Sequence, residues 1–466
     1  MVKVNTSMWH DRKMNVGWVS RLLRNPPSAI KTIHGAKIIA AIASYMLFAN
    51  IAHADPMLTN YKHLGVGSCA AGTCHGKLAP QSGTNGTANS NVAQNEYRKW
   101  QTDDLHSQAY TVLENAKSKS IAAKLGIGNP TSAAMCLDCH ADNVPAAQRG
   151  PKFQIRDGVS CEACHGGAEK WIESHTAKTA THQANIGQGM YATESPRPRA
   201  ELCTSCHLGT RNKFATHMIM GAGHPRLVFE LETFVANQPA HYTVDADYVV
   251  RKGKISGMRL WLTGQLTVAR QYASLLQSPL YHTDRILPEL SFYDCHSCHH
   301  PMTNVRWSQQ RVGGDMKPGM LRLQTQSLLM LQTVSEVLDP GSTAELSAAR
   351  MQLVHAGQID RASVDAAVNK IQNWLKAHDS WADRQFTDQE TSKVRRAVVA
   401  LAAEDKAFDY MSAEQVVFSV QTLTYALGDL SLRKAPLDQL FNAVKDQTNF
   451  DPAKFAATAR SVQEKF

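Results

Sequence analysis

The sequence of 466 residues lacks features that would indicate a nucleic-acid-binding or membrane-spanning protein. Aromatic residues make up only 7% of it, and no basic patch is interleaved with aromatic side chains, as nucleic-acid recognition would favour. The apolar run over residues 38–52 is shorter than the roughly 20 residues that a membrane-spanning helix needs. No cysteine remains outside five closely spaced pairs. We therefore expect no nucleic-acid partner and no membrane anchor.

The N-terminus has the pattern of an export signal. Residues 1–37 carry seven basic side chains and one acidic one, and the apolar run ends at an A-x-A site, Ala52-His53-Ala54. This order of segments is typical of a secretory signal peptide. We expect residues 1–54 to be a signal peptide cleaved near Ala54, and the mature protein to be periplasmic. A retained anchor is the alternative, against which the short run argues.

Loss of this leader also changes the charge of the protein. The formal net charge of the whole chain is +9, and removal of the basic leader lowers it to about +3. The basic character of the full sequence is therefore no indication of a nucleic-acid partner.

The ten cysteines occur in pairs, and each second cysteine is followed directly by a histidine. The pairs are Cys69/Cys74, Cys136/Cys139, Cys161/Cys164, Cys203/Cys206 and Cys295/Cys298, and the histidines are His75, His140, His165, His207 and His299. Four pairs have the form C-x-x-C-H, the attachment signature of c-type haem. The first pair has two additional residues between its cysteines.

This order of residues suits covalent haem attachment. Two thiols bond to the two vinyl groups of a porphyrin, and the adjacent imidazole binds the iron. Structural zinc sites also use paired cysteines with histidine, and exported proteins often form disulfides, but neither requires a histidine after every pair. The sequence thus predicts five covalently attached haem c groups, with the five histidines as proximal ligands.

Twelve further histidines follow the leader, enough to supply every iron with a second imidazole. We expect distal ligands among His106, His175, His217 and His224, which follow the first, third and fourth motifs. Weaker candidates are His63, His182 and His282. His296 lies between two attachment cysteines, and His355 and His378 are expected at the surface. Methionine ligation by Met218, Met220 or Met302 is an alternative, although these side chains have a simpler use in packing.

Several of these segments together resemble the multihaem cytochrome c family of the tetrahaem electron carrier in ammonia oxidation, whose haem arrangement hydroxylamine oxidoreductase shares. The matching pieces lie within residues 63–230: Cys74-His75 with Trp100 and His106, Cys136–His140, the run from Gly158 to His175, and Cys203–Leu208. The resemblance implies a mostly helical fold with stacked haems and with His106 and His175 as distal ligands.

The same resemblance implies that the haem on His140 is five-coordinate. This sequence departs from the family pattern in the wider first motif, in its fifth motif and in its long C-terminal region.

We expect a mostly α-helical protein with a loop-rich pentahaem domain over residues 55–317 and a helical bundle over 318–466. About six helices fit the bundle. Apolar spacing over Met320–Leu338 predicts the first, Ser342, Thr387 and Ser412 each begin a capping-box pattern, and Asp451 before Pro452 resembles another N-cap. Structural support, a docking surface and a dimer interface are three roles open to this bundle.

Two functions are compatible with these motifs. The first is a periplasmic electron carrier that exchanges electrons with redox proteins of the periplasm or inner membrane; imidazole on both faces of each iron would favour it. The second is a multihaem oxidoreductase that acts on a small nitrogen or sulfur compound at one five-coordinate haem. By residue type alone, its candidate side chains are Arg156, His182, Arg226, His241 and Tyr242. No C-x-x-C-K motif occurs, and we favour the carrier.

Overall fold

The computed structural model describes residues 60–78, 93–281, 287–299 and 320–466. The expected signal peptide, His282, Met302 and the residues around them lie outside these ranges. Residues 54–466 form one compact unit. The described part is mostly helical, as expected, and within it only two isolated β-bridges occur in place of strands. No described helix is both long and apolar enough to cross a bilayer.

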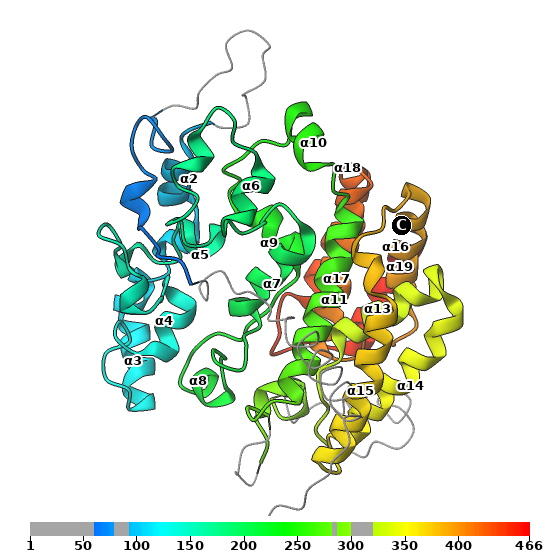
Figure 1. Cartoon of the computed structure of the whole chain (residues 1–466). Coiled ribbons are helices and arrows are strands. Elements are labelled where there is room, and N and C mark those ends of the chain that lie inside the picture. Colours follow the sequence, from blue (N-terminus) through cyan, green and yellow to red (C-terminus); the bar gives the residue numbers. More distant parts are fainter. Residues whose placement is uncertain (1–59, 79–92, 282–286, 300–319) are drawn as a thin grey trace, which may run out of the picture. The chain divides into compact units, whose positions relative to one another are not determined.

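Short helices and long loops make up the part that carries the cysteine pairs (Figure 1). Its helices are α2 (Glu96–Asp103), α3 (Ala116–Leu125), α4 (Ala134–His140), α5 (Cys161–His165), α6 (His182–Gly187), α7 (Pro196–His207), α8 (His217–Gly221), α9 (Leu231–Asn237) and α10 (Ala246–Lys252). Apolar clusters here are small; one consists of Tyr110, Leu113, Leu137 and Ala141. Such small clusters leave room for apolar cofactors to supply much of the core.

A long helix and seven others form the bundle. They are α11 (Gly257–Leu276), α13 (Gln326–Leu338), α14 (Pro340–Ala356), α15 (Arg361–Ala377), α16 (Asp388–Ala403), α17 (Tyr410–Ala426), α18 (Leu430–Val444) and α19 (Pro452–Val462). Helix α11 is buried on nearly all sides and contacts α13, α15 and α17, so it lies in the centre of this core. The fully buried indole of Trp261 donates a hydrogen bond of 3.0 Å to Ser419 Oγ of α17.

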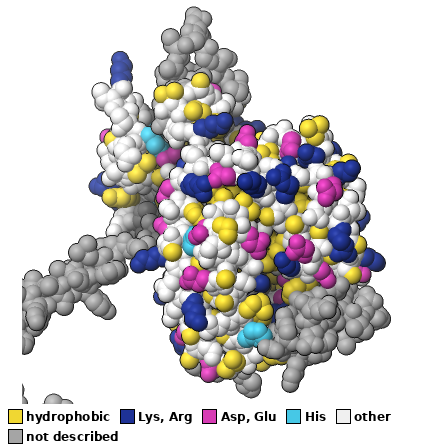
Figure 2. All heavy atoms as spheres, turned by 90° about the vertical axis from the view of Figure 1, so that its right-hand side faces the viewer, with side chains coloured by type: hydrophobic (Ala, Val, Ile, Leu, Met, Phe, Trp, Pro, Cys, Tyr) yellow, Lys and Arg dark blue, Asp and Glu magenta, His cyan; other side chains and the backbone are white. Residues whose placement is uncertain are grey.

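The bundle differs in two respects from its sequence-based outline. Its central helix α11 comes from before residue 318, so the boundary expected at 317/318 divides one continuous apolar core. The first predicted helix ends at Leu338 as expected but begins at Gln326, because Leu323 instead pairs with Tyr293 in a β-bridge. Basic and acidic side chains are interspersed on the face of the molecule shown in Figure 2.

Candidate haem-binding site

Three of the cysteine pairs lie at the C-terminal ends of helices. Helices α4, α5 and α7 end at His140, His165 and His207, the histidines of their motifs. Helical residues three apart lie on the same face, so both thiols of each pair can reach one edge of a planar group. In α7, Pro196 at the first turn favours the helix start.

The wider first motif reaches a similar local closure without a helix. The His75 backbone N–H donates to Cys69 O at 3.1 Å, just as the His299 N–H donates to Cys295 O at 2.7 Å in the fifth motif. The two additional residues form a turn closed by a bond from Cys74 N to Ala71 O. Gly76 has no alternative here, because a Cβ at this position would lie 2.0 Å from Ala70 O. The insertion is therefore absorbed locally.

Each motif histidine faces a second histidine from elsewhere in the chain. The ring centroids are separated by 6.3 Å for His75 and His175, 6.3 Å for His140 and His224, 6.1 Å for His165 and His241, 6.2 Å for His207 and His106, and 6.2 Å for His299 and His217. Five pairs of imidazoles thus share nearly one separation, although their ring planes differ from almost parallel to perpendicular.

This separation is the one expected for two axial ligands of one metal ion. A metal lies about 2 Å from a ligating imidazole nitrogen, and that nitrogen lies about 1.1 Å from its ring centre, which gives about 6.3 Å between two opposite rings. Direct ring stacking would be closer, as for Trp374 and His378 at 3.9 Å. Within the described ranges no group of three or more His, Cys, Asp or Glu side chains is placed to hold a metal ion. The separation within each pair thus fits two imidazoles bound to opposite sides of one metal ion, as in a haem protein.

Hydrogen bonds at Nδ1 orient five of these ten imidazoles. His75 donates to Glu96 at 2.9 Å and His106 to Asp104 at 2.8 Å. Backbone carbonyls accept from the other three: Ala109 O from His140 at 2.9 Å, Ile172 O from His175 at 2.6 Å, and Pro225 O from His224 at 2.8 Å. A proton fixed on Nδ1 leaves the Nε2 lone pair free for a metal, as in most metal-binding histidines.

The electrostatic environment divides the proximal ligands into two kinds. Burial, aided by the neighbouring imidazoles of the same sites, lowers the pKa of His165 and of His207 to about 4. These rings are therefore neutral at pH 7, the state in which imidazole binds iron. The hydrogen bond to Glu96 instead raises the pKa of His75. For Asp104 burial opposes ionisation, but hydrogen bonds from His106 and Gln238 lower its pKa to about 2.

The histidines outside these five pairs have other contacts. His63 is fully buried and its Nδ1 contacts Asp142 Oδ2 at 2.8 Å, while His182 pairs with Glu194 at 2.9 Å. The ring of His296 contacts Tyr410. His378 is buried against Trp374, so its expected surface position is wrong; its Nδ1 contacts Trp374 O at 2.8 Å because the helix ends there.

His241 is the facing residue that the sequence did not reveal as a ligand. It lies in the loop between α9 and α10, and we considered it only as a candidate catalytic group. Its surroundings in sequence, Pro239-Ala240-His241-Tyr242, contain no motif. The sequence indicates it only by count: five proximal histidines require five distal ligands, and the expected set contains four.

Contacts between motifs place four of the sites next to one another. The side chain of Cys69 lies beside that of Cys161, and the side chain of Cys139 lies beside that of Cys206. The first site therefore adjoins the third, and the second adjoins the fourth. The third and fourth are linked by the hydrogen bond from Val159 N, just before Cys161, to the carbonyl of His106 at 3.0 Å.

Over part of its length the chain is similar to c-type cytochromes. Residues 69–166, which hold the first three cysteine pairs, match the model of the family described as cytochrome c554 and c-prime. The match supports covalently bound haem c and a part in electron transfer. No curated protein and no solved structure matches the chain.

Proposed function

We propose that the chain is an exported pentahaem c-type cytochrome that carries electrons between redox proteins of the periplasm or inner membrane. The observation that carries this proposal is the set of five facing imidazole pairs, each separated by 6.1–6.3 Å. Haem c supplies a reversible one-electron couple when bound. The paired thiols would hold each group, and the two facing imidazoles would bind its iron, so that no position would remain for substrate.

The nearness of the sites supports transfer between them. Cysteine side chains of different motifs lie beside one another in two places, so the attachment edges of successive haem groups would lie close together. Asp104 also connects two of the proposed ligands. It accepts hydrogen bonds from His106 and from Gln238, and Gln238 lies three residues before His241. This network joins the third site to the fourth.

The alternative, an oxidoreductase with an open iron on His140, conflicts with the position of His224. The ring of His224 faces that of His140 at 6.3 Å, nearly perpendicular to it. The five-coordinate site implied by the family resemblance would require this imidazole to move away.

The mass and the spectra of the purified mature protein test the carrier proposal. We expect the mass of the chain from about residue 55 plus five haem groups, a c-type absorption spectrum, and little change when carbon monoxide is added to the reduced protein. A mass with fewer haems would contradict the pentahaem proposal. A large carbon monoxide shift, together with turnover of nitrite, hydroxylamine or tetrathionate, would favour the oxidoreductase.

A further inference from the structure

One short segment supplies the second imidazole to two different sites. His217 is the first residue of α8, and His224 follows seven residues later. Hydrogen bonds from Gly223 N to Met220 O at 2.9 Å and from His224 N to Ile219 O at 3.3 Å close a turn directly after the helix, in which Gly223 has a φ of +122°. We call residues 216–226 the junction segment.

The partners of these two histidines come from distant motifs. His217 faces His299 of the fifth motif, and His224 faces His140 of the second. The segment is fixed on both sides. The His217 N–H donates to Glu289 Oε1 at 2.6 Å, close to the fifth motif, and Lys124 Nζ of α3 donates to Ala222 O at 3.1 Å. The spacing between the two sites is therefore set by one anchored stretch of backbone.

We propose that the junction segment joins the fifth haem site directly to the second, so that the five sites form one unbranched series. The series begins at the His75 site and passes through those of His165, His207 and His140 to the His299 site. This inference rests on the proposed function, because it presupposes that each facing pair binds an iron. His217 and His224 are then positioning residues for coupling between sites as well as ligands.

The two ends of the series are the places for exchange with partners. Cys298 is the one exposed attachment cysteine, and His299 beside it is exposed as well. Electrons that enter at one of these sites must pass the three middle sites to reach the other.

Methionine substitutions in the intact holoprotein test the order of sites. Methionine raises the potential of an iron relative to a second imidazole, so H217M, H224M and H175M should each make a different site the first to be reduced. In H217M/H224M the two sites with raised potentials, those of His299 and His140, are neighbours. Reduction of one iron then disfavours reduction of the other. We expect the lower of the two midpoints to fall below its value in the single variant.

The double variant H175M/H217M is the matched control, because it raises the potentials of the two sites at the ends of the series. Its titration should be the plain sum of the two single variants. The proposal is overturned if H217M/H224M also gives the plain sum, or if the two end sites shift each other as much. If a methionine variant does not retain five haems, the same histidines are replaced by glycine. Glycine cannot bind the iron, so each variant site becomes high-spin. Two high-spin irons broaden each other's EPR signals only when their sites are adjacent.

Failure of the proposed function would give a different result. Wild-type protein without five low-spin haems would contradict the carrier proposal before any variant is compared. Five low-spin haems with no mutual shift in H217M/H224M would contradict only the junction.

Discussion

In the proposed haem sites, the acceptor at Nδ1 sets how strongly each imidazole would donate to an iron. Carboxylates accept from His75 and His106, whereas backbone carbonyls accept from His140, His175 and His224. A carboxylate draws the Nδ1 proton more strongly and makes the ring a better donor, which stabilises the ferric state and lowers the potential. The sites of His75 and His207 should therefore have lower potentials than they would with neutral acceptors.

The substitution Glu96→Gln tests this effect at the first site. Glutamine has nearly the same shape and can still accept the bond from His75, but it removes the negative charge, so we expect the potential of one haem to rise. A spectroelectrochemical titration measures the shift. Glu114→Gln is the control, because Glu114 pairs with Arg156 at the surface and faces no ligand. Equal titrations of wild type and Glu96→Gln would contradict the argument.

The angles between facing rings lead to a second expectation. They are 11° for His75/His175 and 32° for His217/His299, but 84° to 89° for the other three pairs. Near-parallel imidazoles split the iron d orbitals unequally and give rhombic EPR spectra, whereas perpendicular imidazoles give a single large-g feature.

The oxidised protein should accordingly show two rhombic low-spin haems and three of the large-g kind. Double integration of the low-temperature EPR spectrum measures this ratio. The variant H175M should remove one rhombic signal and leave all three large-g signals, since it changes only the His75 site. Five signals of one kind would show that the rings rotate when haem is bound.

Sequence patterns located half of this site and missed part of the rest for a physical reason. The proximal ligands are adjacent to their cysteines, so local spacing reveals them. The facing residues come from 76 to 101 positions away along the chain, as for His165 with His241 and His106 with His207, and only folding brings them together. His241 lies in a loop without a motif and therefore escaped notice.

Helix starts were predicted well where the capping residue has no competitor. Thr387 forms the expected capping box with Glu390, and Asp451 caps α19 before Pro452. The starts expected at Ser342 and Ser412 were wrong, because α14 begins at Pro340 after Asp339, and α17 begins after Asp409. Asp409 accepts from Ser412 N at 2.8 Å and so caps α17, whereas proline at the first helical position favours the start of α14.

The start of α9 holds two buried carboxyl groups that behave differently. Glu230 caps the helix and accepts bonds from Thr233 N at 2.8 Å and from Thr422 Oγ1 of α17 at 3.0 Å. Glu232 Oε2 is buried without a hydrogen-bond partner. Burial, reinforced by the charge of Glu230 and opposed by Arg199, raises the pKa of Glu232 to about 8.

This raised pKa makes the stability of the fold depend on pH. The native state holds the Glu232 proton more tightly than the unfolded state, so the free energy of unfolding should fall as pH rises from about 4.5 to about 8. Glu232→Gln should remove this slope and stabilise the protein at pH 8 by on the order of a few kcal/mol, with little effect near pH 4. Chemical denaturation of the holoprotein at both pH values measures it.

Glu336→Gln provides the comparison for that experiment. Glu336 is exposed on α13, so its substitution should change the unfolding free energy by less than about 0.5 kcal/mol at either pH. If Glu232→Gln and Glu336→Gln show the same pH dependence as the wild type, the buried carboxyl does not control stability.

At the scale of the whole molecule, helices of the cysteine-bearing part pack directly against helices of the bundle. Helix α7, which ends at the ligand His207, packs against α11 of the bundle, and α9 packs against α11 and α17. A change of composition near residue 318 suggested two separate parts, but composition does not report which helix fills the centre of a core. These contacts support a structural role for the bundle. Docking and dimerisation stay predictions.

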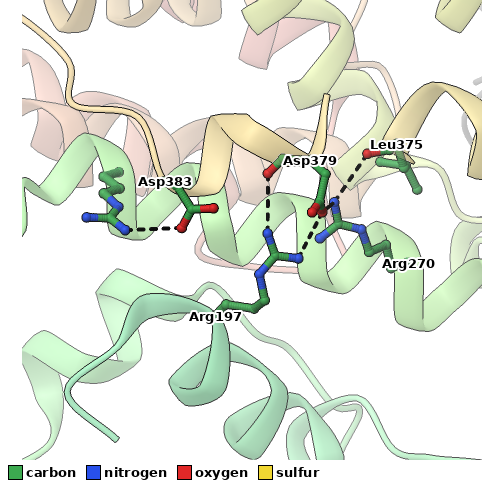
Figure 3. A network of polar contacts seen from close by, with 6 residues as sticks. Arg197, Arg270, Leu375, Asp379 and Asp383 are labelled. Carbon is green, nitrogen blue, oxygen red and sulfur yellow. Dashed lines mark hydrogen bonds and ion pairs between the residues drawn. The ribbon is translucent and has the colours of Figure 1, made fainter. Parts of the chain in front are cut away.

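A cluster of ion pairs connects α7 to the bundle at the end of α15 (Figure 3). Asp379 accepts from Arg197 of α7 at 2.8 Å and also pairs with Arg270 of α11. Arg270 additionally donates to Leu375 O at 3.2 Å. The side chains of Arg197 and Arg270 are 30% and 22% exposed, so both guanidinium groups would be left partly desolvated without this carboxylate.

We expect Asp379→Asn to destabilise the protein by about 1 kcal/mol, because hydrogen bonds to charged groups contribute more than neutral ones but half of this side chain is exposed. Asp383→Asn, in the same turn, is the matched control: Asp383 is 72% exposed and lies 3.4 Å from Arg259, which also bonds Ala382 O. Its effect should stay below about 0.5 kcal/mol.

The stabilisation by Asp379 should also depend on pH. The hydrogen bond from Arg197 and the charges of both arginines outweigh burial and lower the pKa of Asp379, so its contribution should persist at neutral pH and disappear in acid. Thermal unfolding at pH 7 and in acid measures both effects. Equal losses for the two variants would mean that the contact between α7 and α11, and not this carboxylate, holds the haem-bearing helix to the bundle.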